Sequence, residues 1–333
     1  MATTQRRLVL KQRPSGMPDA DCFAMETTDL GAPESGQALI QVEHLSIDAF
    51  IRTALDEGSF HATVPIGGTV TALGVGRVLA SASDALAPGD AVFGPLGAQS
   101  HLLMPAAALR KLDATDVPPR AYLGALGLTT GLTAWAGMVR VGEVREGNTV
   151  VVSAAAGAVG SVACEVARLR GARVIGIAGG PEKVRYLQDD LGCVAGIDYK
   201  NDDVGARLSE LAADGIDVFF DNVGGEILDL VLDRMATGAR IVICGAISQY
   251  HDMSAVRGPA LYLRLAERNA SMRGFTVTHH AGAFAEAEAE LGGWLRGGDL
   301  HLRETIVEGI ERFPEALNML FTGGHIGKLL LKP

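Results

Sequence analysis

The hydrophobic pattern of the chain changes at about residue 149. From there to about residue 277, short apolar runs rich in β-branched residues alternate with stretches whose apolar residues recur at helical spacing. Apolar runs without polar alternation are typical of strands that are buried on both faces of a parallel sheet. The pattern therefore predicts an α/β domain with a doubly wound parallel sheet. We expect its strands at residues 149–152, 173–177, 194–198, 216–221 and 240–245, and helices at residues 183–191, 204–213 and 227–235.

The first part of the chain has a different pattern. Alternating segments such as 38–42 and 76–80 are interrupted by turn signals, of which Pro88-Gly89-Asp90 is the clearest, and this predicts a compact β-rich domain. Near the end of the chain, a helical pattern at 314–321 precedes a strand at 327–331. We therefore divide the chain into a β-rich domain (residues 1–122), a doubly wound domain (123–290) and a C-terminal segment that returns to the first domain (291–333).

Small residues follow the first apolar strand of the doubly wound domain. The strand runs into Ala155-Ala156-Gly157-Ala158-Val159-Gly160, and we expect a helix to begin near Ala158. This is the glycine-rich fingerprint of a dinucleotide-binding turn, with alanine in place of its first glycine. Small side chains let the backbone approach a pyrophosphate, and the helix N-terminus favours its negative charge. The spacing indicates a Rossmann-type domain that binds a dinucleotide; an α/β domain without a nucleotide is the alternative.

Charge and composition narrow the classes of partner. The 333 residues carry a formal net charge of -10, which repels nucleic-acid backbones, so we expect no nucleic-acid partner. The hydrophobic content of 48% is ample for large buried cores. The apolar stretch after Arg6-Arg7 is too short for a signal peptide, and no apolar run reaches the length of a membrane span. We expect a cytoplasmic protein without a membrane partner.

Cysteine and histidine spacing gives no sign of a metal. Cys22, Cys164, Cys193 and Cys244 form no C-x-x-C pair, and the eight histidines form no H-E-x-x-H pattern. We therefore predict no metal site, and we interpret most of the cysteines as small packing residues of a reducing compartment.

The end of the second expected strand bears on the choice of cofactor. Dinucleotide sites that prefer NAD usually place Asp or Glu there to bind the ribose 2′-hydroxyl, but here Ala178 runs into Gly179-Gly180. Lys183 follows within one helical turn and could bind a 2′-phosphate. The alternative for Lys183 is a solvated lysine on a helix face, and only the family resemblance of the chain favours NADP(H).

Five blocks of sequence together carry a family resemblance: residues 154–161, 182–184, 220–225, 243–248 with Tyr250, and Gly327-Lys328. The chain resembles the medium-chain dehydrogenase/reductase superfamily, and within it the zinc-independent NADPH-dependent prostaglandin, alkenal and curcumin reductases. The resemblance covers nearly the whole chain and implies a GroES-like β-rich domain beside the Rossmann domain. Zinc-containing members carry a cysteine and a G-H-E motif where this chain has Asp48 and Gly67-Gly68-Thr69, which disfavours zinc chemistry.

The resemblance also implies a set of cofactor contacts. Asn222 could instead cap a helix, Phe275 could be a core residue, and His325 stands where relatives have asparagine. The implied set comprises Thr133, Gly157, Ala158, Val159, Gly160, Gly179, Lys183, Tyr199, Asn222, Cys244, Gly245, Ala246, Ile247, Ser248, Tyr250, Phe275, Thr276, Val277 and His325.

The same resemblance implies hydride transfer to the β-carbon of an α,β-unsaturated ketone or aldehyde. Tyr250 is the candidate donor to the developing enolate oxygen, or else a residue that only packs against the nicotinamide. Glu267 occupies the position of a pocket tyrosine of relatives, so the substrate side diverges. The resemblance suggests a homodimer, while a quinone reductase and a non-enzymatic nucleotide-binding protein are the alternatives. An apolar substrate wall is expected from Phe50, Phe60 and Leu96, with Tyr262 nearby, although each could be core.

Overall fold

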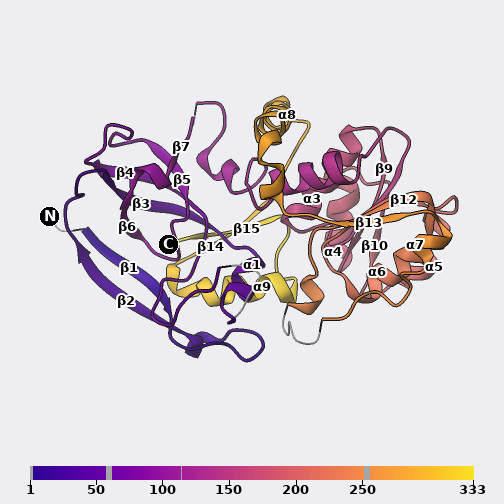
Figure 1. Ribbon diagram of the computed structural model, residues 1–333, viewed down its shortest axis with the longest axis horizontal. Coiled ribbons are helices and arrows are strands. Elements are labelled where there is room, and N and C mark those ends of the chain that lie inside the picture. The colour runs from indigo at the N-terminus through magenta and orange to yellow at the C-terminus, as the bar shows by residue number, and fades with distance from the viewer. Residues whose placement is uncertain (1–2, 58–61, 114, 251–255) are drawn as a thin grey trace. The chain divides into compact units, whose positions relative to one another are not determined.

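The computed structural model describes residues 3–57, 62–113, 115–250 and 256–333, which form two compact units (Figure 1). Unit 1 comprises Met1–Leu123, Glu304–His325 and Leu329–Pro333, and unit 2 comprises Gly124–Arg303 and Ile326–Lys328. Helix α8 (Phe284–Gly297) runs through residue 291, where the sequence placed a boundary. The chain first passes from unit 2 to unit 1 at Glu304, after helix α8 has ended. It returns to unit 2 for Ile326–Lys328.

Unit 1 is built around a seven-stranded sheet in which strands of the chain's beginning and end are neighbours. The order is β14-β15-β3-β4-β5-β7, with β6 paired to β3, and β1 and β2 form a separate antiparallel pair. The alternating segments 38–42 and 76–80 lie in β3 and β4 as expected. The elements are β1 (Thr3–Leu10), β2 (Phe23–Leu30), β3 (Gln37–Ser46), α1 (Phe50–Ala54), β4 (Gly74–Ser81), β5 (Ala91–Gly94), β6 (His101–Pro105), β7 (Arg110–Lys111), β14 (Glu304–Glu308), α9 (Phe313–Thr322) and β15 (Lys328–Lys332).

The core of unit 1 joins its N-terminal strands to the C-terminal segment. Ile40 and Leu45 of β3 are fully buried in one cluster with Phe313 and Leu317 of α9 and Leu331 of β15. Burying these side chains requires α9 and β15 near the end of the chain to pack against β3 near its beginning.

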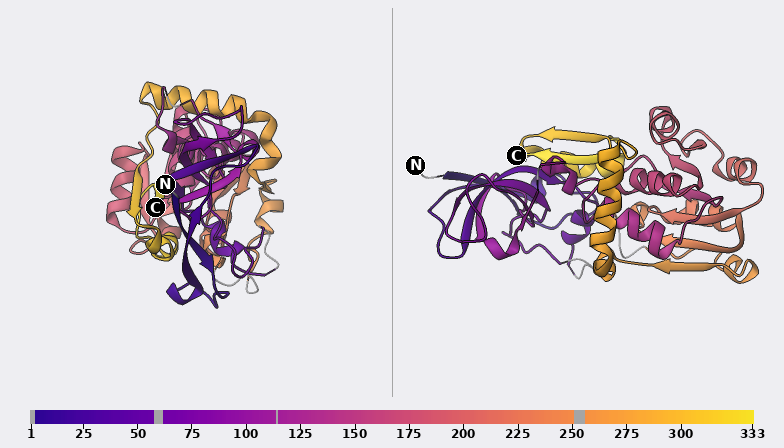
Figure 2. Two further views of the ribbon diagram at one scale, coloured as in Figure 1. Left: turned by 90° about the vertical axis from the view of Figure 1, so that its left-hand side faces the viewer. Right: turned by 90° about the horizontal axis from the view of Figure 1, so that it is seen from above.

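Unit 2 contains a six-stranded parallel sheet in the order β10-β9-β8-β11-β12-β13. This confirms the predicted doubly wound parallel sheet. In Figure 2 the strand β13 lies along one edge of this sheet. The elements are α2 (Gly131–Trp135), the π-helix η4 (Ala136–Val141), β8 (Thr149–Val152), α3 (Ala158–Leu169), β9 (Arg173–Ala178), α4 (Pro181–Arg185), the π-helix η5 (Tyr186–Asp190), β10 (Ala195–Asp198), α5 (Val204–Leu211), β11 (Ile216–Asp221), α6 (Gly225–Leu232), β12 (Met235–Ile243), α7 (Arg264–Glu267), β13 (Ser271–Gly274) and α8.

Both faces of this sheet are covered. Val151, Ile175 and Phe219 project from neighbouring strands into one cluster with Leu208 of α5 and Leu228 of α6. A Cβ on Gly176, whose side chain would face the other way, would lie 2.7 Å from the side chain of Leu187 in η5. Strands with helices on both faces need no polar alternation, which explains the apolar runs seen in the sequence.

Three expected elements differ from the structure in extent or winding. The strand expected at 240–245 begins earlier, at Met235, because Met235 already pairs with Ile216 of β11, and the helix expected at 227–235 therefore ends at Leu232. The helix expected at 183–191 is divided into α4 and the π-helix η5. Apolar periodicity locates a helix, but it does not show where α-helical hydrogen bonding changes to π-helical hydrogen bonding.

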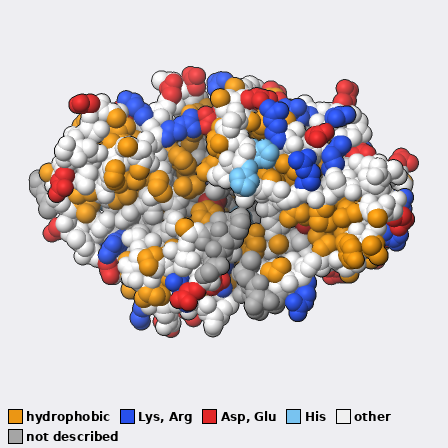
Figure 3. Space-filling view, viewed as in Figure 1, with side chains coloured by type: hydrophobic (Ala, Val, Ile, Leu, Met, Phe, Trp, Pro, Cys, Tyr) orange, Lys and Arg blue, Asp and Glu red, His pale blue; other side chains and the backbone are white. Residues whose placement is uncertain are grey.

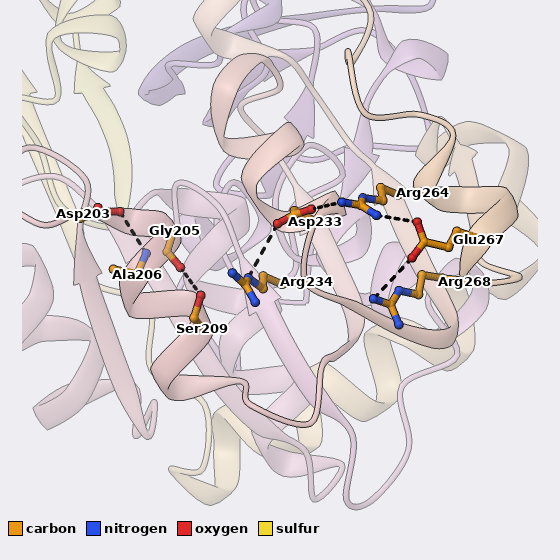
Figure 4. A network of polar contacts seen from close by, with 9 residues as sticks. All are labelled: Asp203, Gly205, Ala206, Ser209, Asp233, Arg234, Arg264, Glu267 and Arg268. Carbon is orange, nitrogen blue, oxygen red and sulfur yellow. Dashed lines mark hydrogen bonds and ion pairs between the residues drawn. The ribbon is translucent and has the colours of Figure 1, made fainter.

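Polar contacts fix the ends of the helices on the α5–α6 face (Figure 4). The carboxylate of Asp203 accepts a hydrogen bond from the backbone N–H of Ala206 and caps α5. Asp233, which follows α6, forms an ion pair of 2.8 Å with Arg264, and Arg264 also pairs with Glu267. These exposed pairs connect α6 to α7 and contribute little to stability individually.

The described surface shows no uniformly basic side in the view of Figure 3, where acidic and basic side chains are interspersed. In the described part of the chain, no helix is long and apolar enough to cross a membrane. Within the same residues, no group of three or more His, Cys, Asp or Glu side chains could hold a metal ion.

Candidate dinucleotide-binding site

The small-residue turn lies between β8 and α3 at the carboxyl edge of the sheet. Helix α3 begins at Ala158 with Gly157 as its N-cap, and no side chain caps its first N–H groups. Gly157, Ala158 and Val159 are partly exposed, whereas Gly160 is buried. Backbone N–H groups at such a helix start can bind phosphate oxygens.

Gly160 is required by the packing of this turn. A Cβ at position 160 would lie 2.3 Å from the carbonyl oxygen of Ala154 and 2.8 Å from the Cα of Ala155. No side chain fits into this space, so the glycine allows the helix to approach the strand closely. The geometry fits a pyrophosphate-binding turn, in which the third glycine has this packing role.

A segment that the sequence analysis did not place at this turn lies directly beside it. The backbone N–H of Gly327 donates to the carbonyl oxygen of Ala156 over 2.8 Å, and Gly327 bridges Gly157. Gly327 has a φ of +71°, and a Cβ there would lie 1.9 Å from the carbonyl oxygen of Arg303. The sequence marked Gly327-Lys328 as part of the family resemblance and predicted a strand at 327–331. It did not predict that Gly327 and Lys328 belong to unit 2.

Lys183 and Tyr199 follow neighbouring strands. Lys183 lies in α4, which comes after β9, and Tyr199 directly follows β10. Tyr199 follows β10 with 49% of its surface exposed, and a Cβ on Gly179 would lie 2.7 to 2.9 Å from its ring and hydroxyl. Partial burial, together with the charge of Lys200, lowers the pKa of the half-buried Lys183. Two cations near a partly exposed glycine turn could hold an anion such as a 2′-phosphate. The cofactor contacts of Gly179, Lys183 and Tyr199 stay predictions.

The loop after β11 is fixed by a buried carboxylate that the sequence analysis did not select. Asp221 is fully buried, and it accepts hydrogen bonds from the Ser153 hydroxyl and from the backbone N–H groups of Val223 and Gly224. Burial raises the pKa of Asp221, and the hydrogen bonds counteract this shift. The side-chain amide of Asn222 donates to the carbonyl oxygen of Ser153 over 2.7 Å. Asn222 is thus anchored to the end of β8 rather than capping a helix.

The predicted segment 244–248 is tied to that loop. The N–H groups of Cys244 and Gly245 both donate to the carbonyl oxygen of Asp221, and the Ser248 hydroxyl donates to the carbonyl oxygen of Val223. Burial raises the pKa of the Cys244 thiol to about 12, so the thiol stays protonated at neutral pH. The backbone of this segment, which includes Ala246 and Ile247, follows the end of β12.

Tyr250 is held by the same segment. Its phenol oxygen accepts a hydrogen bond from the backbone N–H of Ala246 over 3.1 Å. Burial raises the pKa of Tyr250, so the phenol keeps its proton at neutral pH. The phenol O–H can therefore donate to a further acceptor while its oxygen remains bound to Ala246.

The remaining predicted contacts of unit 2 lie on other elements. Thr133 in α2 is partly exposed, and its hydroxyl donates to the carbonyl oxygen of Leu128 over 2.7 Å. Phe275 is partly buried, and its ring contacts the ring of His280 edge-on at 5.9 Å. Thr276 and Val277, which follow Phe275, are also partly buried. Phe275 therefore combines packing with exposed surface, and its cofactor contact stays a prediction.

The other predicted residues fall in several places. His325 belongs to unit 1, and its Nδ1 lies 3.2 Å from the carbonyl oxygen of Met319. Leu96 is fully buried in the core of unit 1, which favours its alternative interpretation as a packing residue. Phe50 is partly buried against the same core, Tyr262 in unit 2 is 59% exposed, and Phe60 lies outside the described residues.

Comparison with known proteins agrees with this arrangement. A family model described as the N-terminal domain of oxidoreductase matches residues 6–112, and one described as zinc-binding dehydrogenase matches residues 158–291. The NADPH-dependent curcumin reductase of Escherichia coli is 34% identical over 333 residues, covering 98% of this chain and 96% of that protein. Prostaglandin reductase 1 of Rattus norvegicus is 36% identical over 329 residues, covering 97% of each chain.

A similar solved structure contains the cofactor. CurA from Vibrio vulnificus in complex with NADPH superposes with a TM-score of 0.92 and 35% sequence identity, covering 98% of each chain.

Proposed function

The chain belongs to the medium-chain dehydrogenase/reductase superfamily, and we propose that it is an NADPH-dependent reductase of the C=C bond of α,β-unsaturated ketones and aldehydes. The observation that carries this proposal is one edge of the sheet in unit 2. There a small-residue turn follows β8, Lys183 and Tyr199 follow β9 and β10, and Tyr250, whose pKa is raised by burial, follows β12. The names of the similar curcumin, prostaglandin and alkenal reductases support the choice of reaction.

The cofactor is held, in this proposal, by the edge of the sheet from β10 to β12. The turn at Gly157–Gly160 binds the pyrophosphate, and Lys183 with Tyr199 binds the 2′-phosphate. The absence of Asp or Glu at the end of β9 removes the usual acceptor for the 2′-hydroxyl of NADH.

Bound NADPH supplies a hydride for the β-carbon of the enone. Negative charge then develops on the carbonyl oxygen of the substrate, and the O–H of Tyr250 donates a hydrogen bond to it. The backbone N–H of Ala246 holds the phenol oxygen, so this donor is oriented before the substrate arrives. A proton from water, added at the α-carbon, completes the saturated product.

The experiment that tests this proposal follows the absorbance of reduced nicotinamide with NADPH or NADH and a panel of enals, enones and quinones. We expect oxidation of NADPH with enones, faster than with NADH, and a product saturated at the C=C bond by mass spectrometry. Consumption of quinones alone would identify a quinone reductase instead. Binding of NADPH without turnover of any compound would contradict catalysis.

A homodimer and a cytoplasmic location are the remaining parts of the proposal. The edge strand β13 pairs only with β12 among the described strands, and Tyr262 and Leu263, which directly precede α7, are 59% and 67% exposed. An open strand edge and exposed apolar side chains are typical of surfaces that a partner covers. Light scattering of the purified chain measures the oligomeric state, and a monomer at micromolar concentration would contradict the dimer.

A further inference from the structure

Two loops meet at the end of the sheet that carries Lys183 and Tyr199. Strands β9 and β10 are parallel, and their last residues, Ala178 and Asp198, are in register. The backbone N–H of Tyr199 donates to the carbonyl oxygen of Ala178 over 3.0 Å. The loop after β9 begins with Gly179-Gly180, and the loop after β10 begins with Tyr199.

The carboxylate of Asp198 connects these two loops. Its Oδ1 accepts a hydrogen bond from the backbone N–H of Gly180 at 2.8 Å and one from the backbone N–H of Lys200 at 3.1 Å. Its Oδ2 accepts from the side-chain amide of Asn201 at 2.7 Å. Only 7% of Asp198 is exposed. One side chain thus bridges the turn after β9 and the turn after β10.

The carboxylate of Asp198 is occupied by donors from the two loops. Three N–H donors occupy its two oxygens, so the carboxylate is not presented as an acceptor for a ribose hydroxyl. The same bonds hold the backbone of Lys200, and the ring of Tyr199 is placed against Gly179. Lys200 lies in the loop that Asp198 joins to the turn before Lys183, and burial together with the charge of Lys200 lowers the pKa of Lys183.

We propose that Asp198 is a positioning residue for the 2′-phosphate of NADPH, and that Lys200 is a second cation of that subsite. Asp198 holds the loop with Tyr199 and Lys200 against the loop with Gly179 and Gly180, so that Lys183 and Lys200 act on one anion. This inference rests on the proposed cofactor. It adds two residues that the family resemblance did not supply.

Loss of the Asp198 carboxylate can change phosphate binding in two opposite directions. Removal of a nearby negative charge should strengthen phosphate binding, whereas loss of a bridge between the loops should weaken it. The substitution Asp198→Ala removes both the charge and the bridge. Asp198→Asn removes the charge but keeps a carbonyl oxygen for the N–H groups of Gly180 and Lys200.

The test measures the binding of two cofactor fragments to the full chain by calorimetry. The first fragment is adenosine 2′,5′-bisphosphate and the second is 5′-AMP, which lacks the 2′-phosphate. We expect Asp198→Ala to weaken the bisphosphate about tenfold and 5′-AMP less than about twofold, where tenfold corresponds to about 1.4 kcal/mol. We expect Asp198→Asn to retain wild-type affinity for the bisphosphate or to exceed it.

Lys200→Gln tests the second cation without disturbing the bridge, because Asp198 binds the backbone of residue 200. We expect about tenfold weaker binding of the bisphosphate and a smaller dependence of its affinity on salt. Asp189→Asn in η5 is the matched control for Asp198→Asn, because it also removes one carboxylate from unit 2, but at an exposed position. It should change the affinity of neither fragment.

The outcomes separate this inference from the proposed function. A wild-type chain that binds both fragments equally would contradict NADPH as the cofactor. A wild-type chain that prefers the bisphosphate, together with an Asp198→Ala variant that binds it equally or more tightly, overturns the role of Asp198. If Asp198→Ala does not fold, weaker binding of the bisphosphate by Asp198→Asn would also overturn the proposal. Unchanged binding by Lys200→Gln overturns the role of Lys200.

Discussion

The backbone N–H of Ala246 donates a hydrogen bond to the phenol oxygen of Tyr250 over 3.1 Å. The ring is therefore fixed by the segment that follows β12, and its position does not depend on a substrate. Because burial also raises the pKa of Tyr250, the hydroxyl remains a donor across the neutral range.

Tyr250→Phe should separate the donor role of Tyr250 from a packing role. We expect kcat with an enone to fall about a hundredfold or more, because a phenyl ring fills the space but cannot donate to the carbonyl oxygen. The KM for NADPH should change less than about twofold, since the packing surface is retained. Steady-state kinetics with both substrates varied makes the measurement. A variant with the wild-type kcat would leave Tyr250 only as a residue that packs the cofactor.

Lys183→Gln should reduce the preference for NADPH. We expect the KM for NADPH to rise about tenfold or more and the KM for NADH to stay nearly constant, because only NADPH carries the 2′-phosphate. Arg185→Gln is the matched control, since Arg185 is an exposed cation of the same helix α4. An equal rise in the KM for NADPH and the KM for NADH would indicate that Lys183 does not bind the 2′-phosphate specifically.

Gly160→Ala should destabilise unit 2 and weaken cofactor binding. The new Cβ would lie 2.3 Å from the carbonyl oxygen of Ala154, so α3 must move away from the turn after β8. Overpacking of this kind costs roughly 1–3 kcal/mol, measurable by urea unfolding. Gly293→Ala in α8 is the control, because a Cβ there meets nothing within 4 Å, and alanine in a helix should stabilise it. Equal stability of the two variants would contradict the packing role of Gly160.

Glu165→Gln should change how stability depends on pH. Glu165 in α3 is fully buried, its Oε1 accepts from the backbone N–H of His301 at 2.8 Å, and burial raises its pKa to about 8. Between about pH 4.5 and pH 8 the unfolded chain releases this proton while the folded chain keeps it. The wild-type free energy of unfolding should therefore fall, relative to that of the glutamine variant, as the pH rises through this window.

The difference between wild type and Glu165→Gln should approach roughly 1.4 kcal/mol for each pH unit within that window and become constant above it. Urea unfolding at pH 5, 6.5, 8 and 9 measures this difference. Glu146→Gln, at an exposed position, should show no such trend. A constant difference between wild type and Glu165→Gln at all four pH values would mean that the carboxyl ionises normally in the folded chain.

Several parts of the site could be predicted from local sequence. The run from Thr149 to Gly160 contains a complete strand, turn and helix start, so its geometry depends mainly on residues that are close in the chain. Lys183 follows Gly179-Gly180 within one turn and could be selected for the same reason. The family resemblance, which the comparisons confirm, extended this reading to the segment 243–248 and to Tyr250.

Other residues could not be found from spacing alone. Ser153 and Asp221 are 68 positions apart, and they meet because β8 and β11 are neighbours in the sheet. From the sequence, Leu96 could line a substrate pocket or belong to the core, and the structure buries it in the core of unit 1. Leucine suits an apolar pocket wall and a core equally, so the sequence could not distinguish the two. The start of β12 at Met235 likewise depends on a pairing partner in another strand.

The sequence by itself determined the alternation of strands and helices, the small-residue turn at Gly157 and Gly160, and the absence of a carboxylate at the end of β9. Each of these depends on backbone conformation and on side chains a few residues apart. Only the tertiary structure decided that Gly327 lies beside that turn and that Asp198 bridges two loops. These relationships depend on which strand ends share an edge and which buried polar groups find partners there, and a hydrophobic pattern does not contain that information.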